Sequence, residues 1–188
     1  MKNIFKSDII KMIVALTAVG IISGSTLVLV YNYAMPKIKI NVSKETESAI
    51  KNIFPEADQI KSFKEKDVYQ VLDKSGKLLG YAFVAEGNGY QGLIKLIVGV
   101  DSGVSKMQGM EVLESQETPG LGAEIASKDF RAQFEGLALD HPIEYVKNQK
   151  PDQPYQIEAI TGATISSRAV VTLLNERIEE INKLLKGE

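Results

Sequence analysis

Residues 68–85 read VYQVLDKSGKLLGYAFVA, and this stretch contains the pattern from which the fold can be derived. Two apolar-rich runs, Val68–Leu72 and Lys77–Ala85, lie on either side of the polar tetrapeptide Asp73–Gly76. Runs of this kind, separated by a short segment that ends in glycine, are typical of a β-hairpin. The stretch therefore predicts two antiparallel strands joined by a tight turn.

A second hairpin is predicted immediately downstream. Leu93–Val100 and Val104–Leu113 are strand-like runs, and the turn sequence Asp-Ser-Gly lies between them at Asp101–Gly103. Two successive hairpins build a mostly antiparallel sheet. A further strand is predicted at Gln156–Ile160, directly before a segment rich in threonine and serine.

Three helices accompany these strands. Ser43–Phe54 has an amphipathic pattern that Pro55 stops, and Ser127 can cap a helix from Lys128 to about Phe134. A longer helix is predicted from about Ser167 to Leu185, because its apolar residues recur every three or four positions. Those residues are Val170, Val171, Leu174, Ile178, Ile181 and Leu185. The predicted fold class is therefore α+β, a mostly antiparallel sheet with flanking helices.

The N-terminal segment differs from the rest of the chain, since no charged side chain occurs in the 25 residues from Met12 to Pro36. About 20 apolar residues span the hydrocarbon core of a bilayer as a helix. We therefore predict a cytoplasmic N-terminus at 1–11, a transmembrane helix at 12–35 and a linker at 36–42. A cleaved signal peptide is the alternative, but the apolar run Leu27–Val30 continues past the possible cleavage site and favours an anchor. Lysines flank the segment on both sides and give only a mild preference for a domain outside the cell.

The composition excludes several kinds of chemistry. The absence of cysteine removes disulfides, thiol catalysis, iron–sulfur clusters and cysteine-ligated zinc. The single histidine, His141, leaves no histidine ligand set for zinc or haem, so we predict no metal site. Any redox function would therefore require an organic cofactor. A net charge of −2 gives no reason to expect nucleic acid as a partner.

Two glycine-containing segments have more glycine than a simple turn needs. They are GNGYQG at Gly87–Gly92 and ETPGLG at Glu117–Gly122. Glycine lets the backbone approach a flat ligand closely, and Tyr90 could pack against a ring. Ordinary turns explain either segment equally well when it is taken alone.

The third segment, EAITGATISSRAVV at Glu158–Val171, places four hydroxyl side chains around a Gly-Ala pair at the start of the last predicted helix. The hydroxyls belong to Thr161, Thr164, Ser166 and Ser167. A phosphate next to Thr164 would meet free backbone N–H groups and the positive end of the helix dipole. Helix capping is the alternative explanation. No lysine follows the motif as it would in a Walker loop, which argues against nucleotide hydrolysis.

With TGAT at Thr161–Thr164, ETPGLG upstream, GYQG and one N-terminal membrane helix, the chain resembles the FMN-binding G subunit of the Rnf electron-transport complex. It also resembles the related C subunit of the Na⁺-translocating NADH:quinone reductase. The resemblance extends over essentially the whole chain. The C subunit of the reductase is usually longer, so a length of 188 residues fits the G subunit of Rnf better.

In that family the last threonine of the S/T-G-A-T motif carries FMN through a phosphoester bond. The resemblance therefore implies that Thr164 is the attachment point, and that Ser166 and Ser167 cap the helix and bind the phosphate. A flavin transferase installs the FMN from FAD, and its recognition pattern often has aspartate six residues before the threonine. This chain has Glu158 at that position, which keeps the charge on a longer side chain.

The resemblance also implies a wider set of flavin contacts, without a catalytic residue or a metal ligand. Besides Thr164, these contacts are Thr161, Gly162, Ala163, Ser166, Ser167, Tyr90, Gln91, Gly92, Glu117, Thr118, Gly120, Leu121 and Gly122. The implied FMN-binding domain is α+β, occupies residues 43–188 and lies outside the cytoplasm.

The implied function is electron relay through covalent FMN in a membrane-bound, ion-translocating ferredoxin:NAD⁺ oxidoreductase. The chain would be a redox subunit and would not be catalytic alone. Its expected partners are the other Rnf subunits, the flavin transferase and membrane lipid. Three alternatives stay open: the C subunit of the quinone reductase, an anchored FMN-domain regulator or reductase, and a non-catalytic scaffold in which the hydroxyl cluster only caps a helix.

Overall fold

The computed structural model describes the backbone of residues 2–186, and the side chains of that range except those of 2–7, 39 and 66. The chain divides into two compact units, Met1–Lys44 and Glu45–Glu188. Helix α1, Lys2–Ile53, extends across this division and contributes its last turns to the second unit.

Helix α1 is continuous through residues 36–42, which the sequence predicted to be a separate linker. The connection between the membrane segment and the domain is therefore helical, and Pro36 lies inside α1. Proline has a φ close to the helical value and removes one N–H donor, so a long helix can continue through it at a cost. The helix predicted at 43–54 is confirmed as the last turns of α1, and it ends at Ile53, before Pro55.

The first unit exposes an apolar surface. Large apolar side chains of α1 between Ile9 and Val30 are 51–74% exposed. Within the described residues, α1 is the one helix that is long and apolar enough to cross a membrane. Apolar side chains are unfavourable in water, so this surface favours a hydrocarbon environment.

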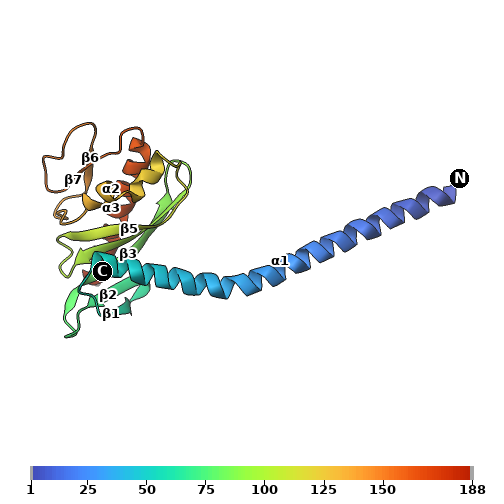
Figure 1. Ribbon diagram of the computed structural model, residues 1–188, viewed down its shortest axis with the longest axis horizontal. Helices are drawn as coiled ribbons and strands as arrows, with labels where there is room; N and C mark the ends of the chain where they lie inside the picture. Colours follow the sequence, from blue (N-terminus) through green and yellow to red (C-terminus); the bar gives the residue numbers. More distant parts are fainter. Residues whose placement is uncertain (1, 187–188) are drawn as a thin grey trace. The chain divides into compact units, whose positions relative to one another are not determined.

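The second unit is built on a five-stranded antiparallel sheet with the strand order β1-β2-β3-β4-β5 (Figure 1). The strands are β1 Gln59–Phe63, β2 Glu65–Leu72, β3 Leu78–Asn88, β4 Leu93–Asp101 and β5 Met107–Ser115. Both predicted hairpins are therefore confirmed. The strand β1 was not predicted from the sequence. Its two partly buried residues, Ile60 and Phe63, lie three positions apart and not at the two-residue spacing typical of a strand.

A second, smaller sheet pairs β6, Glu144–Val146, with β7, Gln156–Glu158. This pair is parallel, unlike the main sheet. The strand predicted at 156–160 is thus confirmed over its first three residues. It leads directly to α3, Thr164–Lys186.

Helices cover both faces of the main sheet. Helix α3 packs through Val170, Leu174, Ile178 and Ile181 on one face, with Phe83, Leu96 and Val98 of the sheet in the same core cluster. The last turns of α1 pack through Ile50 on the other face, with Val71, Ala82 and Ile97 in the cluster. The 3₁₀ helix η1, Gly122–Ala126, and helix α2, Lys128–Ala132, follow β5. The predicted cap of α2 is confirmed, because the Ser127 hydroxyl accepts a hydrogen bond from the Phe130 N–H.

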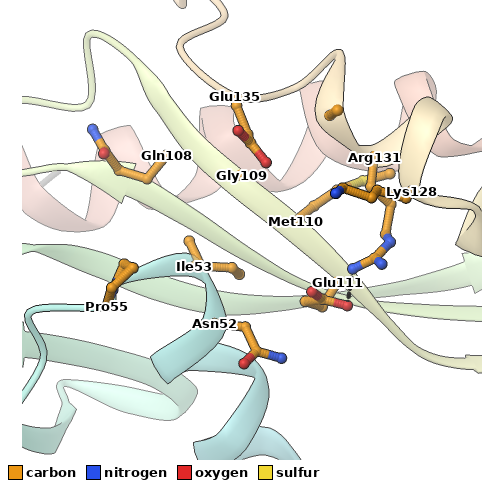
Figure 2. A pocket seen from close by; sticks show the side chains of 11 residues that line it. Asn52, Ile53, Pro55, Gln108, Gly109, Met110, Glu111, Lys128, Arg131 and Glu135 are labelled. Atoms are coloured by element: carbon orange, nitrogen blue, oxygen red, sulfur yellow. Dashed lines mark ion pairs between the residues drawn. The ribbon is translucent and has the colours of Figure 1, made fainter.

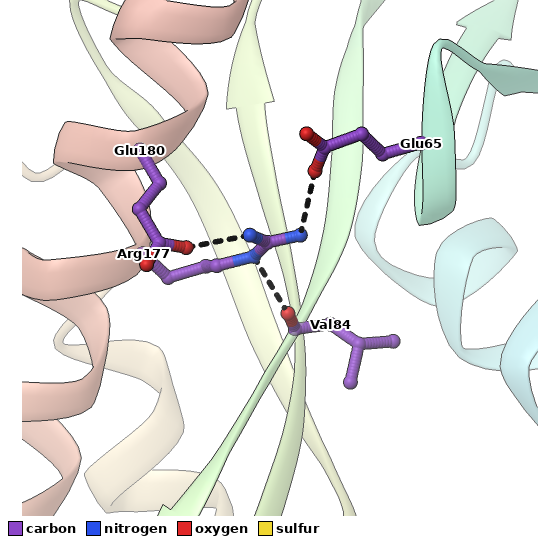
Figure 3. Close-up of polar contacts among 4 residues, drawn as sticks. All are labelled: Glu65, Val84, Arg177 and Glu180. Carbon is purple, nitrogen blue, oxygen red and sulfur yellow. Dashed lines mark hydrogen bonds and ion pairs between the residues drawn. The ribbon is translucent and has the colours of Figure 1, made fainter.

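Arg177 ties α3 to the sheet through polar contacts (Figure 3). Its Nε donates to the backbone carbonyl of Val84 over 3.2 Å. Its Nη1 lies 2.6 Å from the carboxylate of Glu180, and its Nη2 lies 4.0 Å from that of Glu65. The guanidinium therefore links the middle of α3 to strands β2 and β3, and it fixes the position of the helix whose first turn lies at the candidate site.

Candidate functional site

The three segments that the sequence singled out meet around one cavity of about 430 Å³. They come from the β3–β4 turn, the loop after β5, and the start of α3. The lining residues are Tyr90, Glu117, Thr118, Leu121, Gly122, Gly162, Ala163, Thr164, Ile165 and Ser166. Nine of these ten are among the predicted contacts, so the fold brings most of the predicted set together.

The β3–β4 turn forms one side of the cavity. The Gly89 N–H donates to the Gly92 carbonyl over 2.8 Å and closes the turn. A residue larger than glycine would crowd Gln116 at position 92, because its Cβ would lie 2.7 Å from the Gln116 side-chain oxygen. The turn presents Tyr90, whose side chain is 67% exposed at the rim of the cavity.

The loop after β5 forms a second side. The Thr118 carbonyl accepts hydrogen bonds from the N–H groups of Leu121 and Ala123, which turns the chain sharply. Gly120 has a φ of +73° in this turn, a conformation that other residues adopt only with strain. The Thr118 hydroxyl also donates to the Gln91 side-chain oxygen, which links the loop to the β3–β4 turn. Leu121 is thereby held at the cavity and is 49% exposed.

The start of α3 forms the third side. The Ala163 N–H donates to the Ile160 carbonyl over 3.0 Å, and Gly162 has a φ of +82° in the same turn. The helix begins at Thr164, whereas the sequence predicted a start near Ser167. Thr164 is therefore the first residue of the helix rather than a residue before it. The first N–H groups of any helix lack carbonyl partners within the helix, so this wall offers donors to a ligand.

Ser166 and Ser167 lie inside α3 and do not cap it, which corrects the expectation from the sequence. The Ser166 hydroxyl donates to the Glu117 carboxylate over 2.7 Å. The Ser167 hydroxyl accepts from the Ile160 N–H over 3.0 Å and donates to the Ala163 carbonyl over 3.1 Å. Both side chains are buried, and their hydroxyls hold neighbouring segments in place instead of pairing with the free N–H groups of the first turn.

The Thr164 hydroxyl has a different environment. Its side chain is half-buried and lines the cavity, and it makes no hydrogen bond within the described part of the chain. The residues that line the cavity include neither lysine nor arginine. A phosphate bound here would therefore depend on backbone N–H groups and hydroxyls rather than on a cationic side chain.

Five predicted residues do not line this cavity. They include Gln91, Gly92, Gly120 and Ser167, which belong to the same three segments as the lining residues. Thr161 lines a separate cavity of about 420 Å³, together with Glu124, Asp129 and Glu158. Within the described residues, no group of three or more histidine, aspartate or glutamate side chains could hold a metal ion.

Ile165 lines the cavity but was not predicted from the sequence. It is 47% exposed and lies next to the buried Ala163 and Ser166. Ile165 is out of phase with the apolar stripe of α3 that begins at Val170. Single exposed apolar residues are common on protein surfaces, so this pattern alone would not have identified Ile165 as a wall residue.

Another cavity of about 410 Å³ lies between the end of α1, strand β5 and helix α2 (Figure 2). Asn52 and Ile53 line it from α1, and Arg131 lines it from α2. Arg131 forms an ion pair with Glu111 of β5 in its wall. It contains no residue of the predicted set, and Arg131 in its wall is already paired with Glu111. It is therefore the weaker candidate for a ligand site.

Comparisons with known proteins match the part of the chain that contains this cavity. A family model described as an FMN-binding domain matches residues 89–179, a range that contains all ten residues of the cavity wall. The chain is 31% identical to the G subunit of the ion-translocating oxidoreductase complex of Methanosarcina acetivorans, over 93% of this chain and 95% of that protein. It is 30% identical to the G subunit of the proton-translocating ferredoxin:NAD(+) oxidoreductase complex of Clostridium ljungdahlii, over 92% and 91%. It is 28% identical to the Na(+)-translocating counterpart of Acetobacterium woodii, over 79% of each chain.

Solved structures show the same fold. The crystal structure of Shewanella oneidensis NqrC is 26% identical, with a TM-score of 0.52 over 62% of this chain and 63% of that one. The C subunit of the Na(+)-translocating NADH-quinone reductase of Parabacteroides distasonis is 27% identical, with a TM-score of 0.52 over 58% and 57%. The match thus spans about three fifths of each of those chains.

Proposed function

This chain belongs to the G-subunit family of the ion-translocating oxidoreductase (Rnf) complexes, and from that premise we propose that it relays electrons through FMN attached covalently to Thr164. As a member of the family it is a redox component of a multi-subunit complex and contains an FMN-binding domain. The covalent bond, the position of the flavin and the direction of electron flow belong to the proposal.

One observation carries the assignment to Thr164. Three hydroxyl side chains lie in the first turn of α3, and those of Ser166 and Ser167 are both engaged in hydrogen bonds. Of these three, only the Thr164 hydroxyl makes no hydrogen bond within the described residues, and it lies in the cavity wall. It is therefore the hydroxyl that is available to form a phosphoester.

The surroundings of Thr164 fit a flavin phosphate. The free N–H groups at the start of α3 and the helix dipole both favour an anion there. Because no lysine or arginine lines the cavity, non-covalent attraction for the phosphate would be modest, and a covalent bond would compensate for it. Gly122 lines the cavity without a side chain. A Cβ at that position would lie 2.3 Å from the Glu117 carboxylate and 2.6 Å from the Ser166 hydroxyl.

The other wall residues have roles that follow from their chemistry. Tyr90, Leu121 and Ile165 are exposed apolar or aromatic side chains at the cavity and can cover a flat ring from water. The flavin itself would supply the ability to accept and release electrons. The chain would orient it, exclude water from part of its surface, and hold it near enough to the surface for exchange with a partner. The remaining predicted contacts (Gln91, Gly92, Gly120, Thr161 and Ser167) would act by supporting these segments.

The membrane arrangement is also part of the proposal. The exposed apolar surface of α1 supports a single transmembrane pass. In the proposed orientation, the N-terminus lies in the cytoplasm and the FMN domain lies outside. The other subunits of the complex, the flavin transferase and membrane lipid would then be its partners. The reaction of the whole complex would be electron transfer between ferredoxin and NAD⁺, coupled to ion translocation.

The C subunit of the quinone reductase is the second candidate, because two solved structures of that protein share the fold. The lengths favour the G subunit of Rnf. This chain spans 95% of the M. acetivorans G subunit, whereas its match to the C subunit of Vibrio anguillarum covers 68% of this chain and only 53% of that longer protein. A non-catalytic scaffold is the third candidate, and bound flavin would exclude it.

The test is to co-express the full chain with a flavin transferase, denature it, and record the intact mass and the in-gel flavin fluorescence. We expect a mass increase of one FMN minus one water, and its loss in Thr164→Val. Thr172→Val is the matched control, because Thr172 is an exposed threonine of the same helix that lies outside the motif and does not line the cavity. Covalent flavin retained in Thr164→Val, or no flavin on the wild-type chain beside an active control substrate, would contradict the proposal.

A further inference from the structure

Glu117 is a buried carboxylate in the wall of the candidate site. Its side chain is 6% exposed, and within the described residues no lysine, arginine or histidine forms an ion pair with it. A buried carboxylate is costly unless hydrogen bonds replace its lost water. The arrangement around Glu117 therefore has to provide those bonds.

Three donors from two distant segments converge on this carboxylate. Oε1 accepts from the backbone N–H of Tyr90 over 2.6 Å and from that of Gln91 over 3.0 Å. Oε2 accepts from the Ser166 hydroxyl over 2.7 Å. One side chain thus joins all three walls of the cavity, across separations of 27, 26 and 49 residues in the sequence.

Two glycines make this approach possible. A Cβ at Gly89 would lie 2.1 Å from Oε1 of Glu117, and a Cβ at Gly122 would lie 2.3 Å from Oε2. Real Cβ atoms do not come that close to an oxygen, so any other residue would displace the carboxylate or the backbone. Both oxygens are therefore enclosed by backbone that only glycine permits.

We infer that Glu117 is a positioning residue, which holds the Tyr90 turn against the first turn of α3 and lowers the reduction potential of flavin bound in the cavity. The second effect rests on the proposed function. Reduction adds electron density to the ring, and a nearby carboxylate opposes it in a partly dehydrated site. No lysine or arginine lines the cavity to offset that charge.

The positioning effect can be tested on the full-length chain without flavin, by amide hydrogen exchange in detergent. In Glu117→Ala, both acceptors are lost, and we expect the N–H groups of Tyr90 and Gln91 to exchange at least about tenfold faster. In Glu117→Gln, the side-chain oxygen can still accept both bonds, so the exchange should stay close to that of the wild type. Unchanged exchange in a folded Glu117→Ala chain would overturn the positioning role.

The charge effect can be tested on the flavin-loaded chain by spectroelectrochemistry. Glu117→Gln removes the charge and retains an acceptor, so the midpoint potential should shift upward. Glu114→Gln is the matched control, because Glu114 is an exposed carboxylate three residues earlier that does not line the cavity, and its potential should match the wild type. An unchanged potential in Glu117→Gln, or an equal shift in both variants, would overturn the charge effect.

The two measurements separate this inference from the proposed function. If the wild-type chain takes up no flavin at all, the proposed function fails, and the exchange experiment still decides whether Glu117 positions the turn. If Glu117→Ala does not fold, Ser166→Ala tests the link to α3 alone, with faster exchange of the Ser167 N–H, which donates to the Ala163 carbonyl, as the expected result. Unchanged exchange there would contradict the link.

Discussion

The two faces of the main sheet are each covered by a helix, but the packing differs in kind. On one face, the Phe54 ring that follows α1 lies on two glycines: a Cβ at Gly80 would come 3.1 Å from it and a Cβ at Gly99 2.7 Å. On the other face, α3 buries a stripe of aliphatic side chains and adds the polar contacts of Arg177. On the α1 face, the Phe54 ring fits closely against two glycines of the sheet. On the α3 face, the helix is held by its buried aliphatic surface and by the polar contacts of Arg177.

This difference explains why the site lies on the α3 face. The apolar contacts of α3 with the sheet run from Val170 toward its C-terminal end, whereas its first turn is held by the hydrogen bonds of Ser166 and Ser167. That first turn is where Thr164 lies and where the free N–H groups of the helix point to the cavity. The α1 face has no comparable free helix start, since only the last turns of α1 pack there.

The largest expected effect is on the α1 face. Phe54→Ala removes the ring that fills the glycine groove, and large-to-small changes of this type in a core cost about 3–5 kcal/mol. We expect chemical denaturation of the full chain to show this loss in the free energy of unfolding. Phe54→Leu is the matched control and should cost less, because it keeps most of the apolar volume. An equal loss in both variants would show that the fit to the glycines is not the cause.

The polar tether on the α3 face should contribute less. Arg177→Met keeps much of the apolar stem but removes the donor to the Val84 carbonyl, and a hydrogen bond from a charged group contributes about 1.5–3 kcal/mol. Lys183→Met is the control, because Lys183 pairs with the exposed Glu179 on the same helix, and its loss should change the stability much less. If denaturation gives equal losses, Arg177 acts through surface charge and not through the sheet.

A change at the start of α3 should separate stability from function. Gly162 has a φ of +82°, and Gly162→Ala would strain the turn by about 1 kcal/mol. Because this turn sets the position of Thr164, we expect a fall in the yield of covalent FMN that is large compared with the loss of stability. The intact mass of co-expressed protein measures the yield. Gly76→Ala, in a hairpin turn with a φ of +82° away from the cavity, should cost similar stability and leave the yield unchanged.

The hairpins and the amphipathic helix were predictable because their signals are local. The turn residues of 73–76 and the three- and four-residue spacing of α3 are contained in short windows of sequence. The continuity of α1 through Pro36 was not predictable in this way, since proline usually ends a helix, and the outcome depends on helix formation on both sides. Strand β1 lies at the edge of the sheet and has no clear alternation, so it also left no local signal.

The site was predictable as a set of motifs but not as a geometry. The motifs around Tyr90, Glu117 and Thr164 contain nearly all the residues that line the cavity. The distribution of the hydroxyls was not visible, because the bonds of Ser166 and Ser167 reach residues up to 49 positions away. Long-range hydrogen bonds of this kind follow from the folded arrangement, and this is why the expected helix caps became internal supports.

The smallest expected effect concerns Asp101 in the turn between β4 and β5. Partial burial acts to raise the pKa of its carboxyl, but hydrogen bonds from the Lys106 N–H, the Ser105 hydroxyl and the Ser105 N–H outweigh it and hold the pKa below the ordinary aspartate value. A pKa that is lower in the folded state stabilises the fold above the unfolded pKa of about 3.9, and this contribution is lost as the pH falls through the folded pKa.

Denaturation of the full chain between about pH 6 and pH 2 should therefore show a smaller acid-induced loss of stability in Asp101→Asn than in the wild type. The difference should be small, because the carboxyl is largely in contact with solvent. Glu56→Gln is the control, since Glu56 is exposed and makes no hydrogen bond within the described residues, and its pH dependence should follow the wild type. A parallel pH profile for Asp101→Asn and the wild type would mean that the turn forms equally well around the protonated acid, and that the β4–β5 hairpin is held by its strand pairing alone.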